Sequence, residues 1–186
     1  MSGTRTEEGP PAASAVIGLG GNQGDRLAEL RAGIAALDAH PGIEVLETSG
    51  VYESEYVGPG PDQPPYLNAC AVVATRLAPR ALLAALKGME RARGRDGETH
   101  MRPRTLDLDI LLYGDLVMRT RDLEIPHPRL SERAFVLEPL AELGAGRRVP
   151  DSGQTVGDLC AMIRAADGRV ARRRPDATLS PVTAPD

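Results

Sequence analysis

The segment 105–113, Thr-Leu-Asp-Leu-Asp-Ile-Leu-Leu-Tyr, constrains the fold of this chain more than any other stretch. Its residues alternate in polarity, and successive side chains of a β-strand point to opposite faces of a sheet. Asp107 and Asp109 are therefore predicted to lie on one face. The other face is predicted to be apolar and to pack into a core, with side chains from Leu106, Leu108, Ile110 and Leu112.

Two carboxylates on one face repel each other unless a cation lies between them. Mg²⁺ suits this arrangement, because it binds through one or two carboxylates together with substrate phosphates. Arg104 follows Pro103 just before the pair and adds a positive charge beside the proposed metal. These groups stabilise charge in phosphoryl transfer. From the residues alone, an ordinary solvated face of an antiparallel sheet remains an alternative reading of Asp107 and Asp109.

The rest of the chain alternates between strand and helix patterns. Strands are predicted over residues 15–19, 43–52, 66–76 and 105–113. We expect a helix capped by Asp25 after the first strand and a helix that starts at Pro79 after the third. Helical pieces broken at Pro139 over 131–143 and a helix that starts near Thr155 follow. This order predicts an α+β fold, a ferredoxin-like split-βαβ sandwich with helices flanking a mostly antiparallel sheet.

The length of 186 residues fits one domain with its own core, which we place over 15–167. Residues 1–14 and 168–186 are predicted to be poorly ordered tails, because they are polar, rich in proline and without apolar periodicity. The two cysteines, Cys70 and Cys160, lie far apart and are expected to be reduced core thiols.

The charge and the hydropathy pattern exclude some classes of function. A formal net charge of −4 argues against a broadly basic surface that coats nucleic acid. No apolar run is long enough to span a bilayer, and the first residues lack the apolar core of a secretory signal. We therefore expect a cytoplasmic monomer without nucleic-acid or membrane partners.

Several stretches resemble one enzyme family. Residues 103–110, Pro-Arg-Thr-Leu-Asp-Leu-Asp-Ile, are similar to the signature of the 6-hydroxymethyl-7,8-dihydropterin pyrophosphokinases. Residues 18–22, Gly-Leu-Gly-Gly-Asn, resemble that family's first strand and turn, and residues 63–69, Gln-Pro-Pro-Tyr-Leu-Asn-Ala, resemble its pterin-side strand. Pro-His-Pro at 126–128 resembles its nucleotide-side loop. The likeness extends over about residues 15–160.

The resemblance implies a reaction and a set of catalytic groups. The family transfers diphosphate from MgATP to the hydroxymethyl group of the pterin and releases AMP, a step of folate biosynthesis. Asp107 and Asp109 would hold two Mg²⁺ ions that bridge the triphosphate. Arg104 and Arg95 would be the catalytic arginines, with Arg104 beside the moving phosphoryl charge.

The resemblance also implies two binding regions. The pterin side would consist of Ser54, Val57, Tyr66, Asn68 and Phe135. The ATP side would consist of Glu90, His100, Arg104, Ile110, His127 and Arg133. From the residues alone, the Phe135 ring is equally compatible with a plain core position, and His127 with a structural role. The family's usual Arg-Trp-Gly before Pro103 is replaced here by the residues at 100–102, His-Met-Arg.

Two other classes of function were weighed against this one. Gly18-x-Gly20 with Gly24, after a strand and before a helix, is a relaxed form of the dinucleotide-binding turn of an oxidoreductase. That reading needs repeated βαβ units, which the later pattern lacks. A non-catalytic ligand-binding module of ferredoxin-like fold is the second alternative. It leaves the acidic pair and Arg104 without a role.

Overall fold

The computed structural model describes residues 12–56, 63–94, 103–167 and 171–179. The strands are β1 (Ala13–Gly21), β2 (Ile43–Thr48), β3 (Val51–Ser54), β4 (Tyr66–Thr75), β5 (Asp107–Tyr113), β6 (Met118–Arg119), β7 (Glu124–Ile125) and β8 (Arg172–Arg174). The helices are α1 (Arg26–Asp38), α2 (Pro79–Ala92), the 3-10 turn η1 (Leu130–Glu132), α3 (Ala134–Gly144) and α4 (Val156–Asp167). Within the described ranges, no helix has the length and apolar character needed to cross a membrane.

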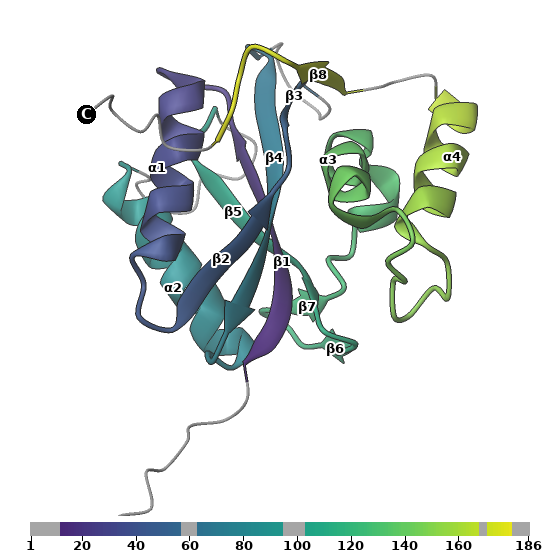
Figure 1. Cartoon of the computed structure of the whole chain (residues 1–186), viewed down its shortest axis with the longest axis horizontal. Coiled ribbons are helices and arrows are strands. Elements are labelled where there is room, and N and C mark those ends of the chain that lie inside the picture. Colours follow the sequence, from purple (N-terminus) through teal and green to yellow (C-terminus); the bar gives the residue numbers. More distant parts are fainter. Residues whose placement is uncertain (1–11, 57–62, 95–102, 168–170, 180–186) are drawn as a thin grey trace, which may run out of the picture.

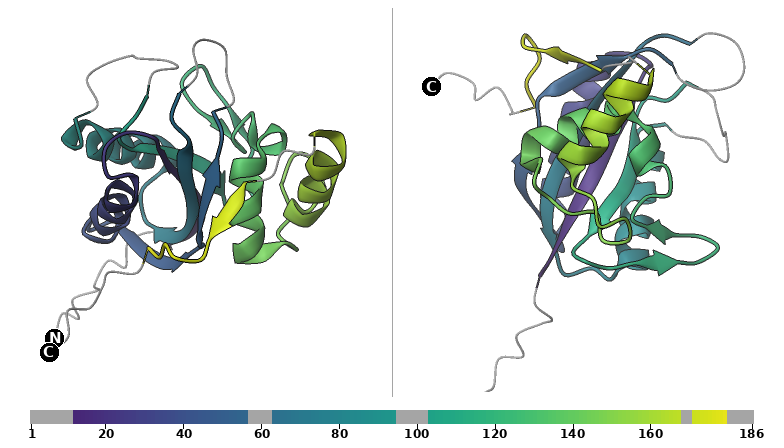
Figure 2. Two further views of the ribbon diagram at one scale, coloured as in Figure 1. Left: turned by 90° about the horizontal axis from the view of Figure 1, so that it is seen from above. Right: turned by 90° about the vertical axis from the view of Figure 1, so that its right-hand side faces the viewer.

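A central sheet separates two layers of helices (Figures 1 and 2). The strand order is β5-β1-β4-β3-β8, and β2 also pairs with β4. Every pairing recorded in this sheet is antiparallel. Helix α1 follows β1, and α2 joins β4 to β5, so the predicted ferredoxin-like split-βαβ arrangement is confirmed. Because β1 lies antiparallel between β4 and β5, the sheet formed by the described residues is not the parallel sheet of a dinucleotide-binding fold.

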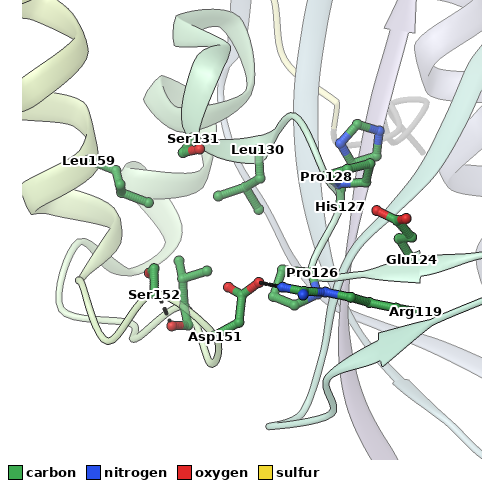
Figure 3. Close-up of a pocket in the computed structure, with 11 residues that line it drawn as sticks. Arg119, Glu124, Pro126, His127, Pro128, Leu130, Ser131, Asp151, Ser152 and Leu159 are labelled. Atoms are coloured by element: carbon green, nitrogen blue, oxygen red, sulfur yellow. Dashed lines mark hydrogen bonds and ion pairs between the residues drawn. The ribbon is translucent and has the colours of Figure 1, made fainter.

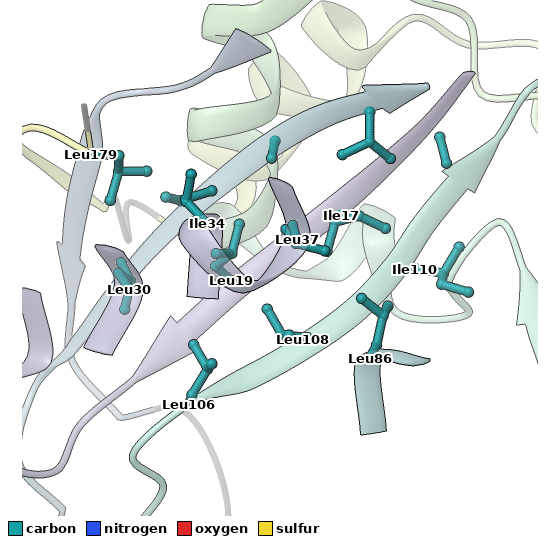
Figure 4. Packing of buried hydrophobic residues seen from close by; sticks show 14 of the residues in the cluster. Ile17, Leu19, Leu30, Ile34, Leu37, Leu86, Leu106, Leu108, Ile110 and Leu179 are labelled. Atoms are coloured by element: carbon teal, nitrogen blue, oxygen red, sulfur yellow. The ribbon is translucent and has the colours of Figure 1, made fainter. Parts of the chain in front are cut away.

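Helices α1 and α2 cover one face of the sheet and begin at their predicted caps. The Asp25 carboxylate accepts a hydrogen bond from the Ala28 amide at 3.1 Å, and Pro79 occupies the first turn of α2. Leu30 and Leu37 of α1 and Leu86 of α2 are fully buried against the sheet (Figure 4). The apolar spacing of these two helices therefore identified their buried faces correctly.

Strand β5 changes face part of the way along its length. Ile110 lies opposite Ile17 of β1, but Leu112 lies opposite Val16, so Leu111 is the additional residue of a β-bulge. Before the bulge, the apolar side chains of β5 pack under α1 and α2 (Figure 4). After it, Leu111 and Leu112 pack with the residues of α3 and α4. The prediction that Leu112 shares the face of Ile110 is therefore wrong.

Two predicted elements differ from the structure. Residues 43–52 form two strands, because the Ser49 hydroxyl accepts a hydrogen bond from the Cys70 amide at 2.9 Å and interrupts the ladder. Helix α3 runs through Pro139 without a break. Leu137 and Leu140 on either side are fully buried, and this packing outweighs the loss of the proline N–H.

The prediction of an unstructured tail over 168–186 is wrong for residues 171–179. Strand β8 pairs with β3 at the edge of the sheet, and Leu179 lies in the core with 3% of its surface exposed. This segment contributes isolated apolar residues to the core rather than a periodic face, which is why its sequence reads as polar. At the other end, β1 already begins at Ala13, and residues 1–11 lie outside the described part.

The buried position of Leu179 predicts a large effect on stability. Leu179→Ala should lower the free energy of unfolding by about 2–5 kcal/mol, because it leaves a cavity in the core. Leu46→Ala is the matched control, since Leu46 is 55% exposed, and it should change stability by less than ~0.5 kcal/mol. Urea unfolding measures both. Equal effects of the two substitutions would mean that the C-terminal segment is not docked.

Candidate active site

Gly20 of β1 leaves the sheet surface open beside the acidic pair, whereas the Leu111 side chain covers Gly18. Gly20 lies between Asp107 on β5 and Asn68 on β4, and Gly18 pairs with Asp109. Glycine has no side chain, so none from β1 separates the carboxylates from the Asn68 amide. A Cβ at Gly20 would lie 3.4 Å from Asn68 Oδ1, which places that oxygen next to the surface that Gly20 leaves open. Asp107 and Asp109 thus share a face, as predicted.

Arg104 forms a close ion pair with the first carboxylate. Its Nη1 donates to Asp107 Oδ2 at 2.6 Å, and the two side chains keep 19% and 23% of their surface exposed. Burial lowers the pKa of Arg104, but the Asp107 charge and this hydrogen bond outweigh burial and raise it overall. The guanidinium is therefore a permanent charge at the edge of the acidic pair.

Lys87 of α2 lies near the second carboxylate and was not identified from the sequence. Its Nζ is 3.9 Å from Asp109 Oδ1 and donates to Glu90 Oε1 at 2.7 Å. It also donates to the Leu108 carbonyl at 3.3 Å. Lys87 and Glu90 are three residues apart on one helix, and this spacing alone would predict that they form an ion pair.

Glu90 of α2 binds the backbone of β5. Its side chain is 1% exposed, and Oε1 accepts a hydrogen bond from the Leu108 amide at 2.8 Å. Burial raises the pKa of Glu90, while Lys87 opposes that rise. This placement does not support the predicted contact between the Glu90 side chain and ATP. The buried carboxylate instead holds the strand that carries Asp107 and Asp109.

Asn22 connects Arg104 to the segment before β4. Its Oδ1 accepts from the Arg104 amide at 2.7 Å, and its Nδ2 donates to Gln63 Oε1 at 3.2 Å and to the Pro64 carbonyl at 3.3 Å. In the sequence, Asn22 stands out only as the last residue of the first turn. The turn itself requires glycine at Gly21, because a Cβ there would lie 2.3 Å from the Thr105 carbonyl oxygen.

The predicted pterin residues of β3 and β4 lie together. Asn68 is 5% exposed and donates from Nδ2 to Ser54 Oγ at 3.0 Å. The Tyr66 hydroxyl donates to Gln63 at 3.2 Å, and its ring stacks with that of Tyr56 at 6.4 Å between centroids. Burial raises the pKa of Tyr66, and the charges of Arg104 and Asp107 also act on it. The acidic pair and these residues therefore form one continuous site.

His127 lies on the other side of the acidic pair, beside the bulge of β5. Its amide donates to the Leu111 carbonyl at 2.9 Å, and its Nδ1 accepts from the Arg129 amide at 3.1 Å. The neutral ring therefore carries its proton on Nε2. Burial lowers the pKa of His127, although the Asp109 charge opposes this.

Arg133 and Phe135 lie at the start of α3. The Arg133 guanidinium lies 5.6 Å from the centroid of the Phe135 ring, a cation–π contact. Burial lowers the pKa of Arg133, and both Asp107 and Asp109 oppose this. Arg133 thus lies within the electrostatic reach of the acidic pair, and the Phe135 ring lies against Arg133.

The remaining predicted residues are placed as follows. The Ile110 side chain is 3% exposed in the core, so only its backbone is available to a nucleotide. Val57, Arg95 and His100 lie outside the described residues, as do the other two residues of the altered 100–102 segment.

A separate pocket of about 360 Å³ lies next to the site (Figure 3). Figure 3 shows Arg119 and Asp151 meeting across it, and their ion pair measures 3.3 Å. Of the predicted site residues within the described ranges, only His127 lines this pocket. The pocket therefore adjoins the acidic pair without containing it.

The acidic pair fits a magnesium ion that shares its ligands with a substrate. Within the described part of the chain, no cluster of three or more His, Cys, Asp or Glu side chains could hold a metal ion. Asp107 and Asp109 supply two hard oxygen ligands on one face, with Asp109 35% exposed. Mg²⁺ commonly binds through one or two carboxylates and completes its shell with phosphates and water.

A partly exposed acidic pair with an adjoining arginine on a ferredoxin-like sheet is typical of a phosphoryl-transferring enzyme. Comparison with known sequences identifies which one. The sequence model of the 7,8-dihydro-6-hydroxymethylpterin-pyrophosphokinase family (HPPK) matches residues 16–145. The chain belongs to this family and is a diphosphotransferase of folate biosynthesis.

Curated relatives agree with this assignment. A 2-amino-4-hydroxy-6-hydroxymethyldihydropteridine pyrophosphokinase from Synechocystis is 44% identical over 142 residues, which cover 76% of this chain and 72% of the relative. The enzyme of the same name from Bacillus subtilis is 43% identical over 129 residues, which cover 69% of this chain and 77% of the relative.

Solved structures support the fold. The wild-type HPPK-DHPS of Plasmodium falciparum, solved with pterin and p-hydroxybenzoate, matches with a TM-score of 0.67 at 15% identity. The match covers 87% of this chain and 44% of that protein, so this chain spans less than half of the fusion protein. A further HPPK-DHPS structure with substrates has a TM-score of 0.66 at 13% identity, with 84% of this chain and 44% of that one covered.

The burial of His127 predicts a lowered pKa for its ring in the substrate-free protein. Its pKa should lie below the ordinary value of about 6.5 in an NMR titration, with His127→Gln used to assign the signal. Because the folded-state pKa is the lower one, the free energy of unfolding should fall as the pH drops through about 6.5, and less so in His127→Gln. A measured pKa above that value would contradict the burial of the ring.

Proposed function

We propose that this chain transfers the diphosphate group of MgATP to the hydroxymethyl oxygen of 6-hydroxymethyl-7,8-dihydropterin. The oxygen attacks the β-phosphorus and releases its hydroxyl proton to solvent. The bond from that phosphorus to the α,β-bridging oxygen breaks, and AMP leaves with the bonding electrons. One observation carries the proposal: Asp107 and Asp109 share an exposed face with Arg104 on one side and Asn68 across Gly20 on the other. The family assignment supports the choice of substrates.

The acidic pair is proposed to hold two Mg²⁺ ions. Bound magnesium would neutralise the triphosphate charge and orient it for in-line attack. The chain keeps the two carboxylates in place through β5, which Lys87 and Glu90 attach to α2 at Leu108. The pair is therefore supported from the rear of the strand and accessible from the front.

Arg104 is proposed to stabilise charge in the transition state. Its side chain is held at Asp107, and Asn22 fixes its backbone at 2.7 Å. The guanidinium thus has little freedom before substrate binds, and its donors are available to phosphate oxygens at the pair. Preorganised charge of this kind lowers the barrier because no rearrangement is needed during the reaction.

The pterin is proposed to lie over the face of β1 at Gly20. The Asn68 amide offers an acceptor beside Gly20, and an amide can match the amide edge of a pterin. Ser54 fixes that amide through its hydroxyl. Tyr66 and Phe135 are proposed as further contacts of the pterin ring, together with Val57 from the predicted loop.

The nucleotide is proposed to bind on the bulge side of the pair. His127 presents Nε2–H as a donor, and Arg133 and Arg104 provide positive charge for phosphates. The backbone of Ile110 is a further proposed contact. Arg95 and His100 stay predictions of the sequence, as do the monomeric state, the cytoplasmic location and the absence of nucleic-acid partners.

A coupled assay of AMP release tests the reaction itself. The wild-type chain should release AMP from MgATP only when the hydroxymethyl-pterin is present, because the pterin oxygen is the attacking group. Release of ADP, or AMP release that does not depend on the pterin, would contradict the proposal.

Loss of a carboxylate should abolish turnover without unfolding the chain. Asp109→Asn should lower kcat by at least about 100-fold, since it removes a metal ligand and conserves the shape of the side chain. Asp115→Asn, at an exposed position just after β5, is the matched control and should leave kcat unchanged. Near-normal turnover of Asp109→Asn would remove the carboxylate from the mechanism.

Arg104→Ala should separate catalysis from binding. We expect kcat to fall by about 100-fold, while the Kd for MgATP rises by less than about tenfold, because the guanidinium acts mainly on transition-state charge. Initial rates give kcat, and calorimetry gives the Kd. If the two constants changed by the same factor, Arg104 would be a simple binding residue.

A further inference from the structure

Three charged side chains cluster on the face of the sheet opposite the acidic pair. Arg26 of α1 lies 3.3 Å from Glu53 Oε2, and Arg174 of β8 lies 3.0 Å from the same oxygen. Glu53 is on this rear face because its neighbours along β3 face the other side, where Tyr52 donates to Glu142 of α3 and Ser54 accepts from Asn68. The cluster is thus separated from the substrates by the thickness of the sheet.

Arg26 contacts both strand ends of the pterin side. The same nitrogen, Nη1, that pairs with Glu53 also donates to the Pro65 carbonyl at 2.7 Å. Glu53 is the residue before Ser54, where β3 ends, and Pro65 is the residue before Tyr66, where β4 begins. The ladder pairs Ser54 with Tyr66 at this end of the sheet, and one guanidinium bridges the residues just before both of them.

Arg174 of β8 is the second arginine that binds the Glu53 carboxylate. Its own orientation is set by Asp176, which accepts from Nε at 3.1 Å and from Nη2 at 2.9 Å. Strand β8 also pairs along β3, with Glu53 opposite Arg172. The family match ends at residue 145, so this support comes from a part of the chain outside the matched region.

The cluster is better suited to positioning than to stability. Arg26 and Glu53 are 29% and 32% exposed, and ion pairs with this exposure contribute little to the free energy of folding. Their geometry nevertheless connects α1, β3, β8 and the start of β4 through one carboxylate. Small displacements of groups that orient a substrate have large effects on its binding and turnover.

We propose that Arg26 is a positioning residue for the pterin half of the site. It sets the place of Ser54 and Tyr66 from the rear of the sheet, with Arg174 fixing the shared Glu53. This inference rests on the proposed function, because it assigns those strand ends to the pterin.

The test compares Arg26→Ala with a matched variant of the same helix. Arg31 also lies on α1 and donates to a backbone carbonyl, that of Thr178, at 2.9 Å, but it is not paired with Glu53 or Pro65. Arg26→Ala should raise the KM for the pterin by about tenfold, the loss expected for charged hydrogen bonds of this kind. The KM for ATP and the melting temperature should match those of Arg31→Ala.

Two further variants keep the test decisive if Arg26→Ala folds poorly. Arg26→Lys should recover part of the pterin affinity, because an ammonium can reach one partner but not hold two in a fixed plane. Glu53→Gln conserves shape and should raise the pterin KM, with no further rise when combined with Arg26→Ala.

Separate results count against the two proposals. If Arg26→Ala and Glu53→Gln raise the KM of both substrates equally, or no more than Arg31→Ala does, the positioning role is refuted. If the wild-type chain shows no pterin-dependent AMP release, the proposed function fails instead, whatever the variants do.

Discussion

The β-bulge at Leu111 is the constraint on which the site depends. Up to Ile110, alternation keeps the core leucines on one face of β5 and the two carboxylates on the other. At Leu111 the strand changes phase, and its next apolar side chains pack under α3 and α4. The Leu111 carbonyl also accepts a hydrogen bond from the His127 amide at 2.9 Å. One irregular residue thus ends the phase that the acidic pair depends on, turns the strand toward α3 and α4, and holds the His127 backbone beside the pair.

The charge of the acidic pair is partly balanced before any substrate binds. Two carboxylates on one strand face repel each other, and this would destabilise the folded chain if nothing opposed it. Arg104 pairs with Asp107 at 2.6 Å, and Lys87 lies 3.9 Å from Asp109. Gly20 of β1 leaves the space between this charged edge and Asn68 open. The arrangement stabilises the fold and leaves both carboxylates partly exposed.

Local signals in the sequence predicted the parts of the structure that depend on local physics. The alternation of 105–110, the Asp25 cap and the proline start of α2 involve neighbours in the chain, so the sequence revealed them. The bulge at Leu111 depends on pairing with β1, and β8 depends on a partner more than a hundred residues earlier. Asn22 and Lys87 act through tertiary contacts. The sequence marked Asn22 only as the last residue of the first turn, and Lys87 only by its spacing to Glu90.

The central claim is that a divalent cation and the nucleotide phosphates meet at the face of β5 that carries the two aspartates. Mn²⁺ in place of Mg²⁺, added with a non-hydrolysable ATP analogue, would test this claim by paramagnetic broadening of amide NMR signals. The account predicts that the Gly18 and Gly20 signals disappear, while that of Leu179 in the core stays sharp. If the Gly18 and Gly20 signals stayed sharp at saturating metal and nucleotide, the proposed metal site would be wrong.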